Sequence, residues 1–332
     1  MVYARIAGTA NYLPERVLTN ADLEKMLKDA HPDDPSQWTN NEWIIERTGI
    51  ETRRIARPDE SPGSMGGIST EKSLEDAKTD ARDLGMIICC TNTRKKDFPP
   101  SAAQIHAYVK APITCGIMDI QAGCTSFTTG LQVADGLIRA GIHKTIALVG
   151  ADKMSDVVDY KDRKTSILFG DLACTWILKA GDKPGIVPIP GGGLYCDSQY
   201  RGLITLNDQY KIEMDGRKVF ELAVEVIPDT ILNVLEKTNY TLADVKMVAP
   251  HNANGRIITA CIRKLAKKTG IPEKEMEEKF YHKTKEYGNT SAGSSANCIH
   301  EARKEGIVKE GDLIVKVDMG AGFTWGVSLI SL

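Results

Sequence analysis

Short apolar runs alternate along the chain with longer amphipathic stretches. Apolar runs of four to eight residues favour buried strands, and apolar residues repeated at helical spacing favour helices. The runs expected to form strands are 2–7, 86–90, 117–120, 145–150, 173–178, 245–249, 313–317 and 325–330. Strands that alternate with helices predict an α/β protein with largely parallel or mixed central sheets, and functional residues are expected where the strands end.

The stretches between these runs predict helices with recognisable ends. Asn20 is expected to cap the first helix, and Gly49 is expected to end the second. The other main helices are expected over 69–84, over 219–235 and from Arg256 onward.

A shift in composition divides the chain. Pro184 and the triple glycine at 191–193 interrupt the alternation, so the boundary is expected near 181–190. We predict two halves, residues 1–180 and residues 181–332. A chain of 332 residues is long enough for two domains or for one large two-lobed unit.

Composition and charge argue against several classes of function. The formal net charge of −2 gives no whole-molecule attraction to nucleic acid or to an anionic membrane. No uncharged apolar run approaches the roughly 20 residues that span a bilayer, and the N-terminus lacks a signal-peptide pattern. The eight cysteines show neither a zinc pattern nor a disulfide framework. We therefore expect a cytoplasmic protein with no metal site and with no nucleic-acid or membrane partner.

Cys124 lies at a turn between an expected strand and an expected helix. The strand ends near Ile120, and Leu131 and Ala134 lie on the inner face of the helix that follows. Gly123 permits an unusual backbone at the turn, and the helix directs its free N–H groups toward the sulfur. Such a site is expected to favour the nucleophilic thiolate, although a small buried thiol that only packs is the alternative.

Three further turns carry candidate chemistry. His251 follows the expected strand 245–249, and Asn289 lies in a tight turn before a helix rich in small residues. The glycine turn at 320–322 could offer backbone N–H groups to an oxyanion. Taken singly, each has a structural explanation as an ordinary histidine, cap or turn. Together they provide the nucleophile, polar partners and oxyanion donors that acyl transfer needs.

These turns and several other motifs give the chain a resemblance to β-ketoacyl-acyl-carrier-protein synthase III of the thiolase superfamily, from Arg5 to Ile330. The motifs occur in the same order along both sequences. They are residues 19–24, 43–50, the Cys124 turn, 169–171, 214–220, 250–256, 288–292 and 322–326.

The resemblance implies a fold and a reaction. The fold is thiolase-like, with two similar α/β halves in a five-layer α-β-α-β-α arrangement, assembled as a homodimer. Cys124 resembles the nucleophile that takes an acyl group from acyl-coenzyme A. His251 and Asn289 resemble the pair that stabilises the enolate after malonyl-acyl carrier protein loses carbon dioxide. The backbone N–H groups of Cys124 and Ala321 resemble the oxyanion hole. Apart from coenzyme A thioesters as substrates, no cofactor is implied.

The resemblance also implies binding residues, each of which could instead be an ordinary core or surface side chain. Those near coenzyme A are Trp43, Arg47, Arg163 and Asn254. Those at the acyl pocket are Met154, Phe169, Ile204, Ile212 and, from the partner subunit of the dimer, the residue equivalent to Phe98. Those at the surface that receives the carrier protein are Arg256, Arg263 and Lys264.

Among several departures from the family pattern, two are changes in segment length. The loop over 29–41 is longer than usual and precedes Trp43, while the segment 194–211 is shorter and leads to the pocket wall. The reaction expected is the condensation that initiates fatty acid synthesis. The alternative is a specialised relative in a cofactor or secondary-metabolite pathway that uses another primer or acceptor. A non-catalytic scaffold is disfavoured, because Cys124, His251 and Asn289 are all present.

Overall fold

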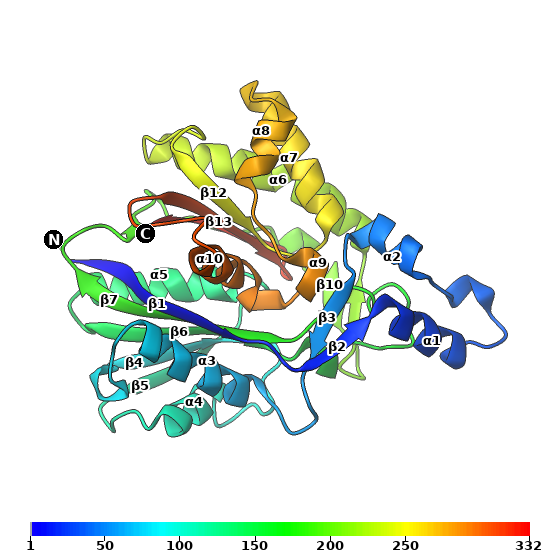
Figure 1. The fold of residues 1–332 in the computed structure, drawn as a ribbon, viewed down its shortest axis with the longest axis horizontal. Coiled ribbons are helices and arrows are strands. Elements are labelled where there is room, and N and C mark those ends of the chain that lie inside the picture. Colours follow the sequence, from blue (N-terminus) through cyan, green and yellow to red (C-terminus); the bar gives the residue numbers. More distant parts are fainter. Residues whose placement is uncertain (1) are drawn as a thin grey trace.

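The computed structural model describes residues 2–332 and contains two large sheets (Figure 1). The first sheet has the strand order β1-β7-β6-β4-β5. Its strands are β1 (Tyr3–Tyr12), β4 (Met86–Cys90), β5 (Gly116–Ile120), β6 (Thr145–Asp152) and β7 (Leu172–Gly181). β4 pairs in parallel with β5 and β6, whereas β7 runs antiparallel to β6 and β1.

The second sheet has the order β12-β13-β14-β8, and β9 also pairs with β14. Its strands are β8 (Ile186–Val187), β9 (Leu194–Cys196), β12 (Val245–Pro250), β13 (Leu313–Gly320) and β14 (Thr324–Ser331). β12 and β13 are parallel, and β14 is antiparallel to its neighbours.

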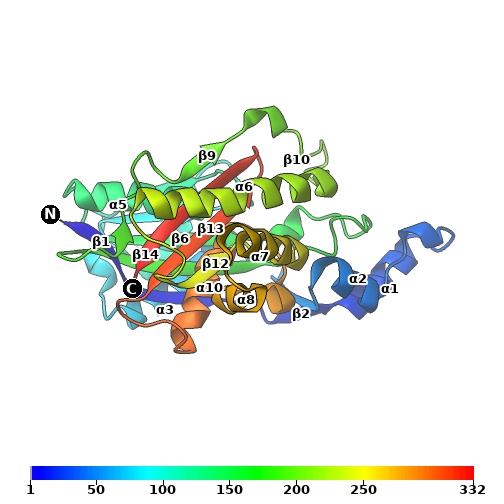
Figure 2. The same cartoon turned by 90° about the horizontal axis from the view of Figure 1, so that it is seen from above.

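Helices form layers outside and between the two sheets (Figure 1). On the outer face of the first sheet lie α3 (Pro62–Asp76) and α4 (Ser101–Val109). Between the sheets lie α5 (Ser126–Arg139) and α10 (Ser294–Lys304). On the outer face of the second sheet lie α6 (Gly216–Lys237) and α7 (Gly255–Thr269), side by side in Figure 2. The five-layer α-β-α-β-α fold expected from the sequence is therefore confirmed.

An apolar cluster runs through the central layer. It joins Leu131 of α5 and Ile299 of α10 to Leu148 of the first sheet and Ile314 of the second. Separate clusters lie under α3 and α4 and under α6 and α7. Because α5 and α10 are covered by a sheet on each side, any polar side chain on their inner turns needs a partner within the protein.

The two halves repeat one topology. β12, β13 and β14 pair with one another as β4, β6 and β7 do. Where β5 pairs with β4, the second half has only an isolated parallel bridge between Val248 and Phe280. α5 follows β5, and α10 follows this bridge. The division at residues 180 and 181 stays a prediction.

Smaller elements gather at one end of the molecule, on the right of Figure 1. They include the ladder of β2 (Arg16–Thr19) with β3 (Thr52–Ile55), the helices α1 (Asn20–Ala30) and α2 (Asn41–Thr48), and the hairpin of β10 (Ile204–Leu206) with β11 (Ile212–Met214). The remaining short helices are α8 (Glu273–Lys279) and α9 (Thr284–Tyr287). Among residues 2–332, no helix combines the length and the apolarity needed to cross a bilayer.

Two local expectations were wrong. Thr19, not Asn20, caps α1: its hydroxyl accepts from the backbone N–H of Asp22, whose carboxylate accepts from the Thr19 N–H in return. Asn20 is buried instead and donates to the carbonyl of Ile50. The helix expected over 69–84 in fact begins at Pro62 and ends at residue 76. Its start was missed because its buried face consists largely of glycine, serine and threonine. An apolar pattern does not detect such a face.

Candidate active site

Cys124 lies between the end of β5 and the start of α5, as expected. Gly123 has φ +59°, a conformation that residues with a side chain rarely adopt. A Cβ on Gly123 would lie 2.9 Å from the backbone nitrogen of Ala321. The turn between β13 and β14 therefore packs backbone to backbone against the Cys124 turn.

Gly320 completes this junction from the other side. A Cβ on Gly320 would lie 2.3 Å from the backbone nitrogen of Cys124, a distance that only glycine avoids. The backbone N–H groups of Cys124 and Ala321, the two predicted oxyanion donors, are thus brought to one junction between the two halves.

The Cys124 thiol is in its neutral form in the free protein. Its Sγ lies 3.6 Å from the Ser291 hydroxyl, and burial raises the pKa of the thiol to about 12, with the carboxylates of Asp152 and Asp318 adding to the effect. The expectation that the site favours a thiolate was wrong in this state. Removal of the sulfur from water outweighs both the Ser291 hydrogen bond and the helix terminus.

His251 directly follows β12 and is held from two directions. Its backbone N–H donates to the carbonyl of Val317 on β13, at 2.7 Å. Its Nδ1 lies 2.6 Å from the Ser294 hydroxyl, which accepts from the Asn252 N–H at 3.3 Å. The Ser294 hydroxyl can point its own hydrogen at Nδ1 while it accepts from Asn252, an arrangement that leaves the imidazole proton on Nε2.

Burial also sets the charge of His251. The residue is only 6% exposed, and desolvation lowers the pKa of His251 to about 4. At neutral pH the side chain is therefore an uncharged hydrogen-bond donor through Nε2.

Asn289 is fixed in a comparable way. It forms a bridge with Phe169, and its Oδ1 accepts from the backbone N–H of Ser291 at 2.9 Å. Since the oxygen is occupied, the amino group of the amide is the part that remains available as a donor.

One cavity of about 960 Å³ connects these groups. Cys124, His251, Asn289 and Ala321 all contribute to its lining. The four residues predicted to act in catalysis therefore line one cavity, although they lie up to 197 positions apart in the chain.

The mouth of the cavity carries an aromatic ring between cations. Trp43 and Arg47 line it, and the guanidinium carbons of Arg47 and Arg163 lie 5.0 and 4.8 Å from the Trp43 ring centroid. Arg163 does not line the cavity itself. It donates to the backbone oxygen of Trp38 at 3.0 Å, which ties the long loop over 29–41 to the mouth.

Asn254 also lines the cavity and contacts two elements. Its Oδ1 caps α7 by accepting from the Arg256 N–H, and its Nδ2 donates to the carbonyl of Arg47 at 3.1 Å. This side chain joins the cavity mouth to the second half of the protein.

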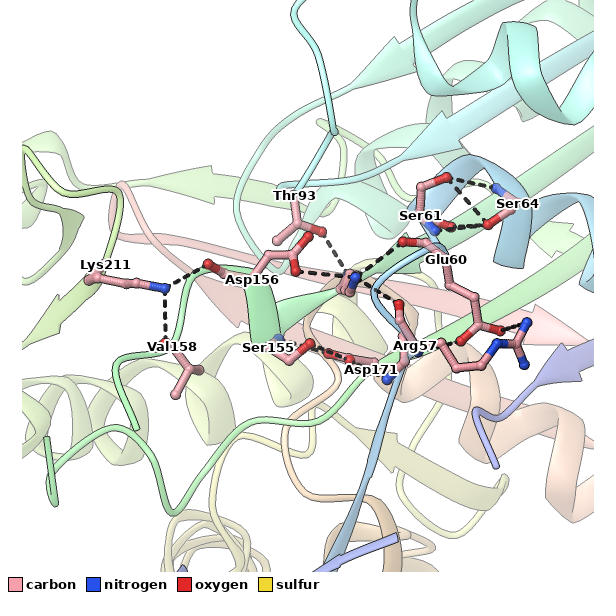
Figure 3. Close-up of polar contacts among 12 residues, drawn as sticks. Arg57, Glu60, Ser61, Ser64, Thr93, Ser155, Asp156, Val158, Asp171 and Lys211 are labelled. Atoms are coloured by element: carbon pink, nitrogen blue, oxygen red, sulfur yellow. Dashed lines mark hydrogen bonds and ion pairs between the residues drawn. The ribbon is translucent and has the colours of Figure 1, made fainter. Parts of the chain in front are cut away.

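The four residues expected at the acyl pocket all line the cavity. They are Met154, Phe169, Ile204 and Ile212. Figure 3 shows how the wall is anchored from behind: Lys211 donates to the carbonyls of Asp156 and Val158, at 2.9 and 3.1 Å. The segment 194–211 is thus hydrogen-bonded, through Lys211 at its end, to the loop that carries Met154.

A buried carboxylate holds the same wall from the other side. Asp171 accepts from the backbone N–H and the hydroxyl of Ser155, at 2.8 and 2.6 Å, as Figure 3 also shows. Burial raises the pKa of Asp171 to about 6. Lys153 donates to the carbonyls of Arg57 and Glu60, so the segment next to Met154 is fixed at several points.

The remaining predicted residues lie outside the cavity. Phe98 is 83% exposed and does not line it within one chain. On α7, Arg256 is exposed, Arg263 pairs with Glu273 at 3.0 Å, and Lys264 donates to the carbonyl of Glu225.

Sequence reasoning missed several residues that organise the site. Ser291 contacts the nucleophile, and Ser294 holds His251. Asn92 donates to the Gly123 carbonyl at 2.9 Å and to Asp152, whose carboxylate also accepts from the Ala292 N–H. The run of small polar residues after Asn289 was the available signal, but hydroxyls in a turn have no pattern that predicts which side chain they will meet.

Comparison with known proteins shows which family the chain belongs to. Residues 118–190 match the family described as 3-oxoacyl-[acyl-carrier-protein (ACP)] synthase III, and residues 235–332 match its C-terminal part. The β-ketoacyl-[acyl-carrier-protein] synthase III of Aquifex aeolicus is 38% identical over 98% of both chains, and that of Serratia proteamaculans is 37% identical over 99% of both. The chain belongs to the β-ketoacyl-acyl-carrier-protein synthase III family.

Solved structures agree with this assignment. The Aquifex aeolicus synthase III structure superposes with a TM-score of 0.89 at 37% identity, covering 99% of this chain and 100% of that one. The priming β-ketosynthase of the R1128 polyketide pathway has the same TM-score at 29% identity, covering 99% and 96%. The thiolase-type fold and the class expected from the sequence, a condensing acyltransferase of fatty acid synthesis, are confirmed.

Proposed function

We propose that this chain joins an acyl group from acyl-coenzyme A to the two-carbon unit of malonyl-acyl carrier protein, through an acyl group on Cys124. The observation that carries the proposal is the shared cavity. Its lining includes the Cys124 thiol and two side chains, His251 and Asn289, whose available groups suit neutral N–H donors. That combination suits attack on a thioester followed by stabilisation of an enolate.

In the loading step the Cys124 sulfur attacks the thioester carbonyl. The carbon–sulfur bond to coenzyme A breaks, and the departing thiolate takes up the proton that the Cys124 thiol gives up. The N–H groups of Cys124 and Ala321 support the oxyanion that forms during the attack. The neutral resting thiol keeps the nucleophile unreactive until a thioester occupies the cavity.

In the condensing step malonyl-acyl carrier protein loses carbon dioxide, and the electron pair of the broken bond forms an enolate. Nε2–H of His251 and the amide N–H of Asn289 donate to the enolate oxygen. The carbanion then attacks the acyl group on Cys124, which releases the thiolate and gives a 3-ketoacyl-acyl carrier protein. A neutral histidine suits this role, because it can donate without needing to be protonated first.

Coenzyme A would enter past the Trp43 ring. The ring and the guanidinium groups of Arg47 and Arg163 suit an adenine base and its phosphates, and Asn254 lies on the way inward. The clamped wall with Met154 and Ile212 would bound the acyl chain. No resident cofactor is needed, because both substrates are activated as thioesters.

The functional unit would be a cytoplasmic homodimer. β5 is the edge strand of the first sheet, and exposed apolar residues gather near it: Ile117 on the strand, Ile113 just before it, and Phe98. An exposed edge strand flanked by apolar side chains is normally covered, and a second copy would cover it symmetrically. Phe98 would then reach the partner's acyl pocket. Arg256, Arg263 and Lys264 would receive the acidic carrier protein.

The direct test is intact-mass spectrometry of the protein after mixing with a panel of acyl-coenzyme A esters. The proposal predicts one acyl group on Cys124, none on a Cys124→Ala variant, and loss of the adduct as 3-ketoacyl-acyl carrier protein appears. An adduct that persists with malonyl-acyl carrier protein but transfers to another acceptor would instead identify the specialised acyltransferase.

A further inference from the structure

A lysine and an aspartate on β13 form an ion pair inside the central layer. Lys316 and Asp318 are two residues apart on the strand that leads into the Gly320 turn, and both side chains are 0% exposed. Neither residue lines the catalytic cavity, so the pair does not itself touch substrate.

Every polar atom of this pair has a partner. The Lys316 ammonium donates to Asp318 and, at 2.7 Å, to Thr128 Oγ1, and it lies 5.2 Å from the centroid of the Phe127 ring. The Thr128 hydroxyl donates to Asp318 Oδ2, and the Ser295 hydroxyl donates to Asp318 Oδ1, each at 2.5 Å.

These partners lie on the elements that carry the proposed catalytic groups. Thr128 is in the first turn of α5, four residues after Cys124. Ser295 is in the first turn of α10, next to Ser294, which holds the His251 ring. Asp318 itself comes two residues before Gly320, whose backbone packs on Cys124. One carboxylate therefore joins three separate parts of the site.

Stability does not account for such a pair. Apolar side chains of similar volume usually replace a buried ion pair without loss, since desolvation of the charges offsets their attraction. What apolar side chains cannot supply is direction, because a hydrogen bond fixes distance and angle and an apolar contact does not.

We propose that Lys316 and Asp318 are positioning residues for the reaction. Through Thr128 they set the place of Cys124 relative to the Ala321 turn, and through Ser295 they set the place of the Ser294–His251 unit. This inference rests on the roles proposed above for Cys124 and His251.

The two connections can be cut separately. Thr128→Val keeps the size of the side chain and the ion pair but removes the link to α5. Ser295→Ala removes the link to α10. Thr129→Val, one residue along the same helix, is the matched control, because the Thr129 hydroxyl donates to the Thr125 carbonyl of its own helix and not to the ion pair.

Rapid-quench mass spectrometry would follow the two half-reactions. We expect Thr128→Val to slow acyl loading of Cys124 by about 10- to 100-fold, the size of effect that small misplacements of reacting groups produce. Ser295→Ala should slow consumption of the adduct by malonyl-acyl carrier protein by a similar factor. Each variant should leave the other step within about twofold, bind one acyl group per chain at completion, and unfold cooperatively. Thr128→Ser should restore the loading rate.

A role confined to packing makes the opposite prediction. If both variants run both steps within about twofold of the parent protein, or slow both steps equally, the inference is wrong. The double variant Lys316→Met/Asp318→Leu guards against misfolding of a single variant: it should slow both steps, and unchanged rates would overturn the proposal. If the parent protein itself acquires no acyl group on Cys124, the site assignment fails first and this inference fails with it.

Discussion

The equivalent strands β6 and β13 of the two halves each bury an aspartate near their ends, and the two carboxylates have different hydrogen-bond partners. Within residues 2–332, the hydrogen bonds that Asp152 accepts at the end of β6 come from neutral groups, among them the backbone N–H of Asn92 at 2.6 Å and that of Ala292 at 3.1 Å. Asp318, on β13, is paired with the ammonium of Lys316. The half that contains Asp152 carries the nucleophile Cys124. The half that contains the Lys316–Asp318 pair carries His251 and Asn289, the donors proposed for the second step.

The difference has an electrostatic consequence. Both carboxylates raise the pKa of the Cys124 thiol, but His251 is affected by Asp318 and Lys316 in opposite directions. The lysine thus limits how far the aspartate can favour a charged imidazole. A neutral nucleophile and a neutral donor can then share a site that is surrounded by buried carboxylates.

The largest effect is expected from separating the ion pair. Lys316→Met leaves Asp318 buried and unpaired, which should cost about 3–5 kcal/mol of unfolding free energy. Lys283→Met is the control, because the Lys283–Glu305 pair is partly exposed and should contribute about 1 kcal/mol or less. Denaturant unfolding compares them. Equal losses in the two variants would contradict the claim that Asp318 depends on a buried charge partner.

A pH effect of about 3 kcal/mol is expected from His251. The unfolded chain protonates this residue near pH 6.5, whereas the folded protein resists protonation down to about pH 4. As the pH falls through this window the unfolded state binds more protons, so stability falls. Asp171, whose pKa is raised to about 6, works in the opposite direction between pH 6 and 3.8.

Only a difference between variants isolates the histidine. Unfolding free energies measured at pH 7 and pH 4.5 should show that a His251→Asn variant loses less stability on acidification than the parent protein. A parallel loss in the two proteins would mean that His251 is not held neutral by burial.

A comparable loss, of about 100-fold in the rate of acyl loading, is expected from Gly320→Ala. The added Cβ would meet the Cys124 backbone nitrogen, so one of the two turns must move. Gly136→Ala on α5 is the matched control, since a Cβ there meets no atom of the described residues within 4 Å. The loading assay compares the two variants. A Gly320→Ala protein that loads normally would show that the two halves need not touch at this junction.

The smallest effect is expected at the carrier-protein surface. Arg256→Glu should slow association with malonyl-acyl carrier protein by less than about tenfold and only at low salt, because exposed charges mainly steer encounter. Arg263→Glu should do less, since Arg263 is already paired with Glu273. Single-turnover rates over a salt series test this. Rates equal to those of the parent protein at every salt concentration, for both variants, would place carrier docking elsewhere.

The sequence predicted those parts of the molecule that local patterns determine. Apolar runs identified the main strands, and the ends of those strands identified Cys124, His251 and the glycine turn. The start of α3 was missed because glycine and serine line its buried face. The ion pair was missed because Lys316 and Asp318 look like ordinary polar residues in a strand, and only the contacts with Thr128 and Ser295 show that they face the core.

The thiol was mispredicted for a related reason. A helix terminus can be inferred from sequence, but the desolvation that raises the pKa of Cys124 depends on residues from both halves.

The central claim is that Cys124 and the His251–Asn289 pair act in different steps. The most direct measurement follows the Cys124 acyl adduct of a His251→Ala variant by rapid-quench intact-mass spectrometry, first with acyl-coenzyme A and then with malonyl-acyl carrier protein. The account predicts that the adduct forms at close to the parent rate and is then consumed about 10²–10³ times more slowly. Failure of the variant to form the adduct at all would contradict it.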